Sequence, residues 1–93
     1  MQNKILVTVA AGFIGFHICK KLLQENYYII GYDNLNPYYD PNLKESRIAY
    51  LTENNCENKK WDFIIGNLED YTLLNSIFLK YRPNIVIHLA AQA

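Results

Sequence analysis

Short apolar runs alternate with amphipathic segments along this chain of 93 residues, and that alternation limits its possible folds more than any other feature. The first run, residues 4–9, reads K-I-L-V-T-V and lacks the polar alternation of a half-exposed strand. Such runs are typical of parallel strands that are covered on both faces. Further runs of this kind occupy residues 27–32, 61–66 and 84–89. We therefore predict four strands.

The segments between the runs are predicted to be mainly helical. Residues 13–25 carry apolar side chains at every fourth position, with Lys20 and Lys21 opposite, which is the pattern of an amphipathic helix. Asn26 tolerates the left-handed backbone that ends helices. Asp70 is a candidate N-cap for a later helix, which Pro83 is predicted to end.

Residues 34–60 form the least regular stretch of the sequence. Two prolines lie near its start, residues 43–51 show loosely helical spacing, and residues 52–60 are polar. We expect a loop, a short helix and a second loop here. The whole chain then reads β-α-β-α-β-α-β, which predicts the α/β class: a Rossmann-type, doubly wound parallel sheet with right-handed crossovers and strand order 3-2-1-4.

Composition excludes several classes of function. Nine basic and nine acidic residues give no net field for nucleic acid or an anionic membrane. The apolar runs are far shorter than the roughly 20 residues of a membrane helix. No leader pattern opens the sequence, so we expect a cytoplasmic protein. Cys19 and Cys56 lack metal-ligand spacing and are expected to be reduced thiols, and no metal site is expected.

Two glycines lie where the first predicted strand meets the first predicted helix. Residues 7–15 read V-T-V-A-A-G-F-I-G, and glycine at such a junction lets the backbone approach a phosphate held by free helix amides. Gly12 and Gly15 have the spacing of the last two glycines of G-x-x-G-x-x-G, but Val9 occupies the first position. The alternative is that both glycines only permit a tight turn and close helix packing.

An acidic residue at the end of the second predicted strand favours nucleotide binding. Asp33 lies 18 residues beyond Gly15, close to the distance at which a carboxylate accepts hydrogen bonds from the adenosine ribose. Its charge would repel a 2′-phosphate, which favours NAD over NADP. A capping or surface aspartate is the alternative.

With these residues in view, the chain resembles the extended short-chain dehydrogenase/reductase family of NAD-dependent epimerases and dehydratases. Within it, the sequence is most similar to the bacterial UDP-glucuronate 4-epimerases associated with capsule sugars. The resemblance covers the whole chain and is most specific in G-Y-D-N-L-N-P-Y-Y-D-P-N-L-K, directly after the second strand. The strings G-N-L-E-D and V-I-H-L-A-A-Q-A extend it.

The resemblance implies NAD as cofactor and a set of contacts to it. The matching positions are Gly12, Phe13, Ile14 and Gly15 for the pyrophosphate turn, Asp33, Asn34 and Asn36 near the adenosine ribose, Asn67 and Leu68 at the adenine edge, and Leu89, Ala90 and Ala91 along the ribose and nicotinamide side. The family usually has aspartate where Asn67 stands, which is a mild departure.

Val9 is the serious departure from the family pattern. At the family's first glycine, an isopropyl group would point into the turn that the cofactor approaches, and a β-branched residue resists unusual backbone angles. We expect NAD binding to be weakened at least tenfold, or about 1.4 kcal/mol.

The residues that carry the family's chemistry are not found in this sequence. The family uses a serine or threonine beyond the fourth strand and a Y-x-x-x-K pair, whereas none of the eight tyrosines has lysine four positions later. Tyr38 and Tyr39 are expected to be loop packing. We therefore expect no catalytic residue and interpret residues 1–93 as a partial NAD-binding domain without a substrate domain. A UDP-sugar would bind only in the full-length parent.

Other readings remain open. The chain can be an inactive piece of an epimerase, a nucleotide-binding module that acts through a partner, or a decayed remnant. A P-loop nucleotidase is excluded because no G-K-[ST] follows the glycines, and a flavodoxin-like receiver lacks its acidic cluster. The fourth strand is expected to leave an apolar, unpaired edge, which favours self-association.

Overall fold

The computed structural model describes residues 3–35, 41–55 and 60–89 of the chain. Strands and helices alternate throughout, as the sequence predicts. The elements in order are β1 (Lys4–Thr8), α1 (Phe13–Gln24), β2 (Tyr28–Asp33), α2 (Pro41–Asn55), β3 (Trp61–Ile65), α3 (Tyr71–Tyr81) and β4 (Ile85–Ile87).

The four strands form one parallel sheet in the order β3-β2-β1-β4. This confirms the predicted order. β1 lies in the middle, where Ile5 is in register with Ile29 of β2 on one side and with Ile85 of β4 on the other. The carboxyl ends of all strands therefore meet at one edge, which is where open α/β sheets bind ligands.

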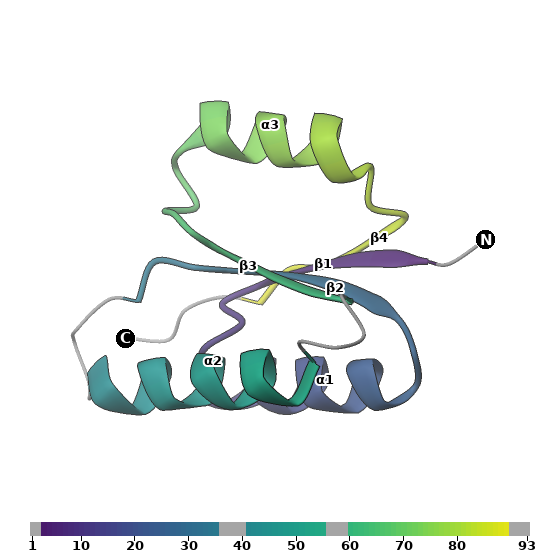
Figure 1. Cartoon of the computed structure of the whole chain (residues 1–93). Helices are drawn as coiled ribbons and strands as arrows, with labels where there is room; N and C mark the ends of the chain where they lie inside the picture. Colours follow the sequence, from purple (N-terminus) through teal and green to yellow (C-terminus); the bar gives the residue numbers. More distant parts are fainter. Residues whose placement is uncertain (1–2, 36–40, 56–59, 90–93) are drawn as a thin grey trace.

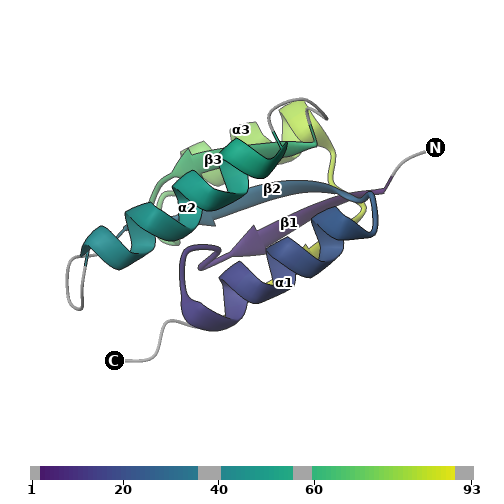
Figure 2. The same ribbon diagram turned by 60° about the horizontal axis from the view of Figure 1, so that its bottom comes forward.

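Helices cover both faces of the sheet (Figure 1). α1 and α2 lie side by side across one face, and α3 covers the other (Figure 2). Because side chains alternate along a strand, Ile5 and Val7 join the core under α1 and α2, whereas Leu6 joins the core under α3. The buried residues of the first core are Ile5, Val7, Ala10, Cys19, Leu23, Ile29, Leu51 and Trp61, and those of the second are Leu6, Ile30, Tyr32 and Ile77.

The helix ends follow the predicted signals. Asn26, two residues after α1, has φ 69°, in the left-handed region. Asp70 caps α3, because its Oδ1 accepts a hydrogen bond of 3.0 Å from the backbone N–H of Leu73. Arg82 forms the C-cap with φ 51°, directly before Pro83.

The prediction for the middle of the chain was wrong in one respect. α2 runs on to Asn55, whereas the sequence predicted a loop from Thr52. Local polar contacts explain the difference: the amide groups of Asn54 and Asn55 donate to the carbonyl oxygens of Tyr50 and Leu51 at 2.8 and 2.7 Å. These side-chain bonds add to the main-chain hydrogen bonds of the last turns of α2.

The fourth strand is shorter than predicted. It spans Ile85–Ile87, whereas the apolar run covers residues 84–89. Beyond the strand, the N–H of Leu89 donates to the side-chain oxygen of Thr8 at 2.8 Å, so a side chain takes the place of a strand carbonyl. Within the described ranges, no helix has both the length and the apolar character needed to cross a membrane.

Candidate functional site

The turn between β1 and α1 is built on close backbone contacts. Gly12, the N-cap of α1, donates its N–H to the carbonyl oxygen of Val9 at 3.1 Å. A Cβ on Gly15 would lie 2.1 Å from that same oxygen and 3.0 Å from Cα of Ala10. Only glycine therefore lets α1 pack this tightly on the turn.

Val9 occupies a strained backbone conformation in this turn. Its φ is 54°, in the left-handed region that costs an L-residue about 1–2 kcal/mol and that a β-branched residue resists most. Its Cγ1 lies 3.2 Å from the position that a Cβ on Gly12 would take. The expected conflict between the side chain and the backbone angle is therefore present at this position.

Asp33 lies against this turn and is buried, with 4% of its surface exposed. It ends β2, and its Oδ2 accepts a hydrogen bond of 2.9 Å from the N–H of Ala11. Its Oδ1 accepts another of 2.9 Å from the N–H of Leu35, so the carboxylate also caps the loop after β2. The surface interpretation is therefore wrong. Asp33 joins the ends of β1 and β2 at the carboxyl edge of the sheet.

Two cations from α2 complete the surroundings of the turn, and the sequence reasoning missed both. Nζ of Lys44 lies 3.1 Å from Oδ1 of Asp33, in an ion pair whose side chains are 17% and 2% exposed. Nη1 of Arg47 donates to the carbonyl oxygen of Ala11 at 2.9 Å, and its guanidinium carbon lies 5.9 Å from the ring centroid of Phe13. Lys44 and Arg47 are three residues apart on the helix that follows β2, so they share one face of it. That spacing was the signal in the sequence that could have indicated both.

The N-terminus of α1 is open toward solvent. Phe13 and Ile14 are 66% and 63% exposed, and among the described residues no side chain caps the helix. Unpaired amides and the positive end of the helix dipole favour an anion at such a place. The open end of α1 therefore suits an anion, and the carboxylate of Asp33 lies against the same turn through its bond to the N–H of Ala11.

The candidate adenine contacts follow β3. The N–H of Gly66 donates to the carbonyl oxygen of Asp33 at 3.1 Å, which brings the end of β3 beside that of β2. Tyr32 donates its hydroxyl to the carbonyl oxygen of Asn67 at 2.6 Å. The side chain of Asn67 is exposed and Leu68 packs against the core under α3.

The candidate contacts after β4 are only partly described. Thr8, buried at the end of β1, accepts the N–H of Leu89 and lies 3.1 Å from Nδ1 of His88. Leu89 is thereby held next to the turn of β1. Asn34 is exposed after β2. Asn36, Ala90 and Ala91, as well as Tyr38, Tyr39 and Cys56, lie outside the described residues.

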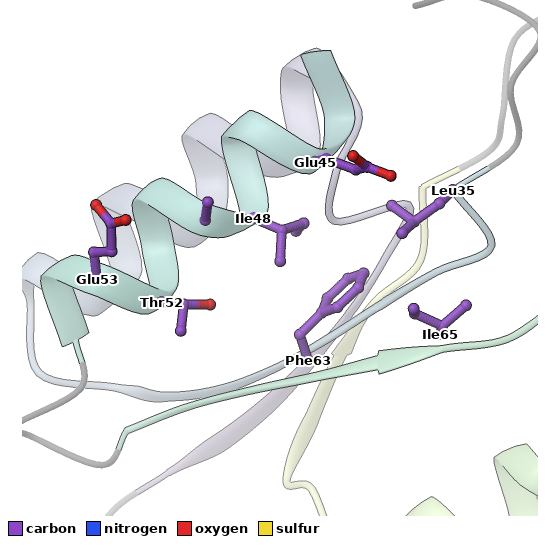
Figure 3. A pocket seen from close by; sticks show the side chains of 8 residues that line it. Leu35, Glu45, Ile48, Thr52, Glu53, Phe63 and Ile65 are labelled. Carbon is purple, nitrogen blue, oxygen red and sulfur yellow. The ribbon is translucent and has the colours of Figure 1, made fainter. Parts of the chain in front are cut away.

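A separate hollow lies between α2 and β3 (Figure 3). Its volume is about 380 Å³, and the side chains of Ile48 and Phe63 point into it from opposite walls. Leu35 and Ile65 close the end nearest the carboxyl edge, and Glu45 stands at its rim. Most of its described lining is apolar, and the charged residues that line it are Glu45 and Glu53.

The thiol of Cys19 takes no part in the turn. It is fully buried on the inner side of α1, and burial raises its pKa from 9.0 to about 12. Such a thiol is unreactive at neutral pH. In the described ranges no three His, Cys, Asp or Glu side chains come together as a metal site.

Comparison with known proteins gives the family. The family model described as GDP-mannose 4,6 dehydratase matches residues 6–93. Protein CapI of Staphylococcus aureus is 42% identical over 90 residues, which are 97% of this chain and 25% of that protein. The probable UDP-glucuronate 4-epimerase of Rhizobium meliloti (strain 1021) is 41% identical over 90 residues, with the same coverage of 97% and 25%. This chain belongs to the NAD-dependent epimerase/dehydratase family, the extended short-chain dehydrogenase/reductases.

Solved structures of the epimerase/dehydratase family share the fold. The UDP-glucose 4-epimerase of Thermotoga maritima, with UDP-glucose, superposes with a TM-score of 0.70 at 38% identity, covering 97% of this chain and 25% of that chain. The Brucella ovis UDP-glucose 4-epimerase, in complex with NAD, gives a TM-score of 0.72 at 34% identity, covering 98% and 23%. The chain thus spans about a quarter of the length of these family members and corresponds to their N-terminal part.

Proposed function

We propose that this chain binds NAD, with the diphosphate at the β1–α1 turn and the adenosine ribose at Asp33. The observation that carries the proposal is the buried carboxylate of Asp33, bonded to the N–H of Ala11 beside the uncapped helix α1. A buried carboxylate at the carboxyl edge of a parallel sheet suits ribose hydroxyls, which donate hydrogen bonds. The Brucella ovis relative, solved with NAD, supports this assignment.

The remaining contacts are proposed from their place around this edge. Gly12 and Gly15 admit the diphosphate, and the amides of Phe13 and Ile14 face it from the open helix end. The other proposed contacts are Asn34 and Asn36 near the ribose, Asn67 and Leu68 at the adenine, and Leu89, Ala90 and Ala91 toward the nicotinamide.

We further propose that the full-length parent is a nucleotide-sugar 4-epimerase of the UDP-glucuronate/UDP-galacturonate type, acting on capsule or related sugars. Identity of 41% to the Rhizobium meliloti protein supports this. Bound NAD would supply the hydride acceptor, and residues 1–93 would bind and orient it as a partial domain. The catalytic side chains and the UDP-sugar site would be contributed by other segments of the parent.

Calorimetric titration of the chain with NAD tests the cofactor assignment. Asp33→Ala should weaken binding at least about tenfold, because a hydrogen bond to a charged group is worth about 1.5–3 kcal/mol. Asp70→Asn is the matched control, since asparagine caps a helix as well as aspartate does and Asp70, the N-cap of α3, is not one of the proposed contacts. Equal losses in both variants, or no binding by the unchanged chain, would contradict the proposal.

Val9→Gly should strengthen NAD binding at least about tenfold, or about 1.4 kcal/mol. Glycine adopts the left-handed φ of 54° without strain and removes the isopropyl group from the turn. Calorimetric titration of the unchanged chain and of Val9→Gly with NAD measures the difference. Equal affinities would show that Val9 does not weaken NAD binding.

One observation favours a second candidate, a remnant without nucleotide affinity: the strained valine at the first position of the phosphate turn. Failure of both the chain and its Val9→Gly variant to bind any adenine nucleotide would favour that candidate. Binding only together with a second chain would indicate a module that acts through a partner.

A further inference from the structure

Strand β3 is an edge of the sheet, and among the described residues it pairs only with β2. The carbonyl oxygen of Lys60 and the N–H of Gly66 bond to β2 at 2.8 and 3.1 Å. Because successive backbone groups of a strand point to opposite sides, the N–H and C=O groups of Trp61, Phe63 and Ile65 face away from β2. Within the described ranges, no backbone hydrogen bond engages these outward groups. The edge therefore offers a row of unused donors and acceptors.

The hollow between α2 and β3 lies directly beside this edge (Figure 3). Phe63 and Ile65 line it from β3, Ile48 lines it from α2, and Ile65 is 61% exposed. β3 reads W-D-F-I-I, without the lysine or proline that often blocks an edge strand. An open edge next to an apolar hollow has the two features of strand addition: main-chain groups for an extended segment and a pocket for one of its side chains.

The charges at the hollow determine which kind of segment fits. Glu45 and Glu53 both line it, and no cation is among its described lining residues. Glu45 takes part in neither ion pair found in the described part of the chain. The two glutamates are eight residues apart on α2, or about 12 Å along the helix. Residues four apart on an extended strand are separated by about 13 Å and point to the same face.

We propose that the free edge of β3 binds an extended, basic segment of a partner protein as an added strand. An apolar side chain of the segment enters the hollow, and basic residues two positions before and after it meet Glu45 and Glu53. A second copy of this chain fits less well, because it would bring the same two carboxylates to the edge. None of these residues is a proposed NAD contact, so the inference is independent of the cofactor assignment.

NMR titration of the full chain with the acetylated and amidated peptide T-K-T-L-T-K-T tests the proposal. The backbone N–H signals of Trp61, Phe63 and Ile65 should shift, whereas that of Asp62, which faces β2, should change least. Replacing the leucine of the peptide by serine should weaken binding at least about tenfold, because the apolar contact in the hollow is lost. Replacing both lysines by glutamates should remove detectable binding. Unchanged affinity in either case would overturn the proposal.

Two N-methylated peptides distinguish strand addition from apolar contact alone. One carries methyl groups on the nitrogens of its lysines and leucine, and the other on those of its threonines. Only alternate N–H groups of an added strand face β3, so one peptide should bind like the unmethylated one. The other should bind at least about tenfold more weakly. Equal affinities would indicate a ligand held by the hollow alone and would overturn the proposal.

Glu45→Lys should weaken binding of the T-K-T-L-T-K-T peptide about fivefold, since repulsion replaces attraction. Glu25→Lys, an exposed change at the end of α1, is the matched control and should leave the affinity unchanged. Unchanged peptide affinity in a Glu45→Lys chain with the same circular dichroism would overturn the proposal. Signals of β3 that shift with protein concentration and not with peptide would identify a second copy as the occupant, which would also overturn it.

Discussion

Helices α1 and α3 begin in opposite ways, although both follow a parallel strand at the same edge of the sheet. At α3, Asp70 accepts the N–H of Leu73 at 3.0 Å, so the helix start is satisfied within the chain. At α1, Gly12 has no side chain to offer, and no other described residue caps the helix. Phe13 and Ile14 stay exposed beside it.

The difference shows which helix start serves folding and which is available to a ligand. A capping aspartate contributes about 1 kcal/mol to stability, and it also places a negative charge where an anion would bind. The start of α1 lacks that stabilising cap, and no capping side chain occupies its first backbone amides. The carboxylate nearest to its turn, that of Asp33, is bonded to Ala11 N–H and neutralised by Lys44.

Gly15→Ala should have the largest effect on stability, because the start of α1 depends on a close backbone contact at Gly15. The new Cβ would lie 2.1 Å from the carbonyl oxygen of Val9, so α1 must move away from the turn. We expect a loss of at least about 3 kcal/mol in the free energy of unfolding. Urea denaturation followed by the fluorescence of Trp61 measures it.

Gly66→Ala is the matched change on the α3 side. Its Cβ would meet the hydroxyl of Tyr32 at 2.4 Å and Cδ2 of Leu73 at 2.5 Å, which are side-chain atoms that can shift. We expect a smaller loss, about 1–3 kcal/mol. Equal losses in the two variants would contradict the special role of the backbone contact at Gly15.

As the pH rises, the stabilising contribution of the buried thiol on α1 should be lost before those of the tyrosines under α3. Burial raises the pKa of Cys19 on α1 from 9.0 to about 12, so its stabilising contribution is complete below pH 9 and is lost as the pH rises toward 12. Under α3, burial and the carboxylate of Asp62 raise the pKa of Tyr28 and of Tyr81 above 10.0, so their contributions begin to fall only above pH 10. The slope per group is at most about 1.4 kcal/mol per pH unit.

Cys19→Val checks this order of events. The variant keeps an apolar side chain of similar size, so the fall in unfolding free energy between pH 9 and 10 should disappear and the fall above pH 10 should remain. Denaturation curves at pH 8, 9, 10 and 11 measure both. An unchanged slope between pH 9 and 10 would assign it to another group.

Asp70→Ala should lower the free energy of unfolding by about 1 kcal/mol, because α3 loses the acceptor of the Leu73 N–H. NAD affinity should not change, since the side chain of Asp70 caps α3 and is not one of the proposed contacts to the cofactor. Urea denaturation and calorimetric titration report the two quantities separately. A change in affinity would mean that the two helix starts are coupled.

Gly12→Ser should have the smallest effect on stability and a clear effect on binding. Serine in place of glycine at an N-cap gains only a few tenths of a kcal/mol, and the contacts of 3.2 and 3.3 Å that its Cβ would make with Val9 offset part of that. The new hydroxyl would occupy an α1 amide, so NAD affinity should fall. Gain of stability without loss of affinity would argue against a diphosphate at this turn.

The sequence predicts the fold well because its signals are local. Asn26, Asp70 and Pro83 mark helix ends by their own backbone preferences, and the apolar runs place all four strands in the observed order. The length of α2 was missed because it depends on asparagine side chains that bond carbonyls four residues earlier. Polar composition alone suggested a loop there.

The candidate site likewise contains residues that the sequence predicts and residues that it does not. Gly12, Gly15 and Asp33 are visible in the sequence because a strand-to-helix turn and the end of the next strand meet at one edge. Lys44 and Arg47 come from a helix whose orientation across the sheet no local pattern gives. Their contribution appears only once α2 is packed against α1 (Figure 2).

The central position of β1 affects how the protein is made. Ile5 pairs with Ile85, which is synthesised 80 residues later. At elongation rates of about 5–20 residues per second, the nascent chain waits about 4–16 s before that side of the strand is filled. During this interval β1 is paired on one edge only, and its other edge is open to pairing with strands of other chains.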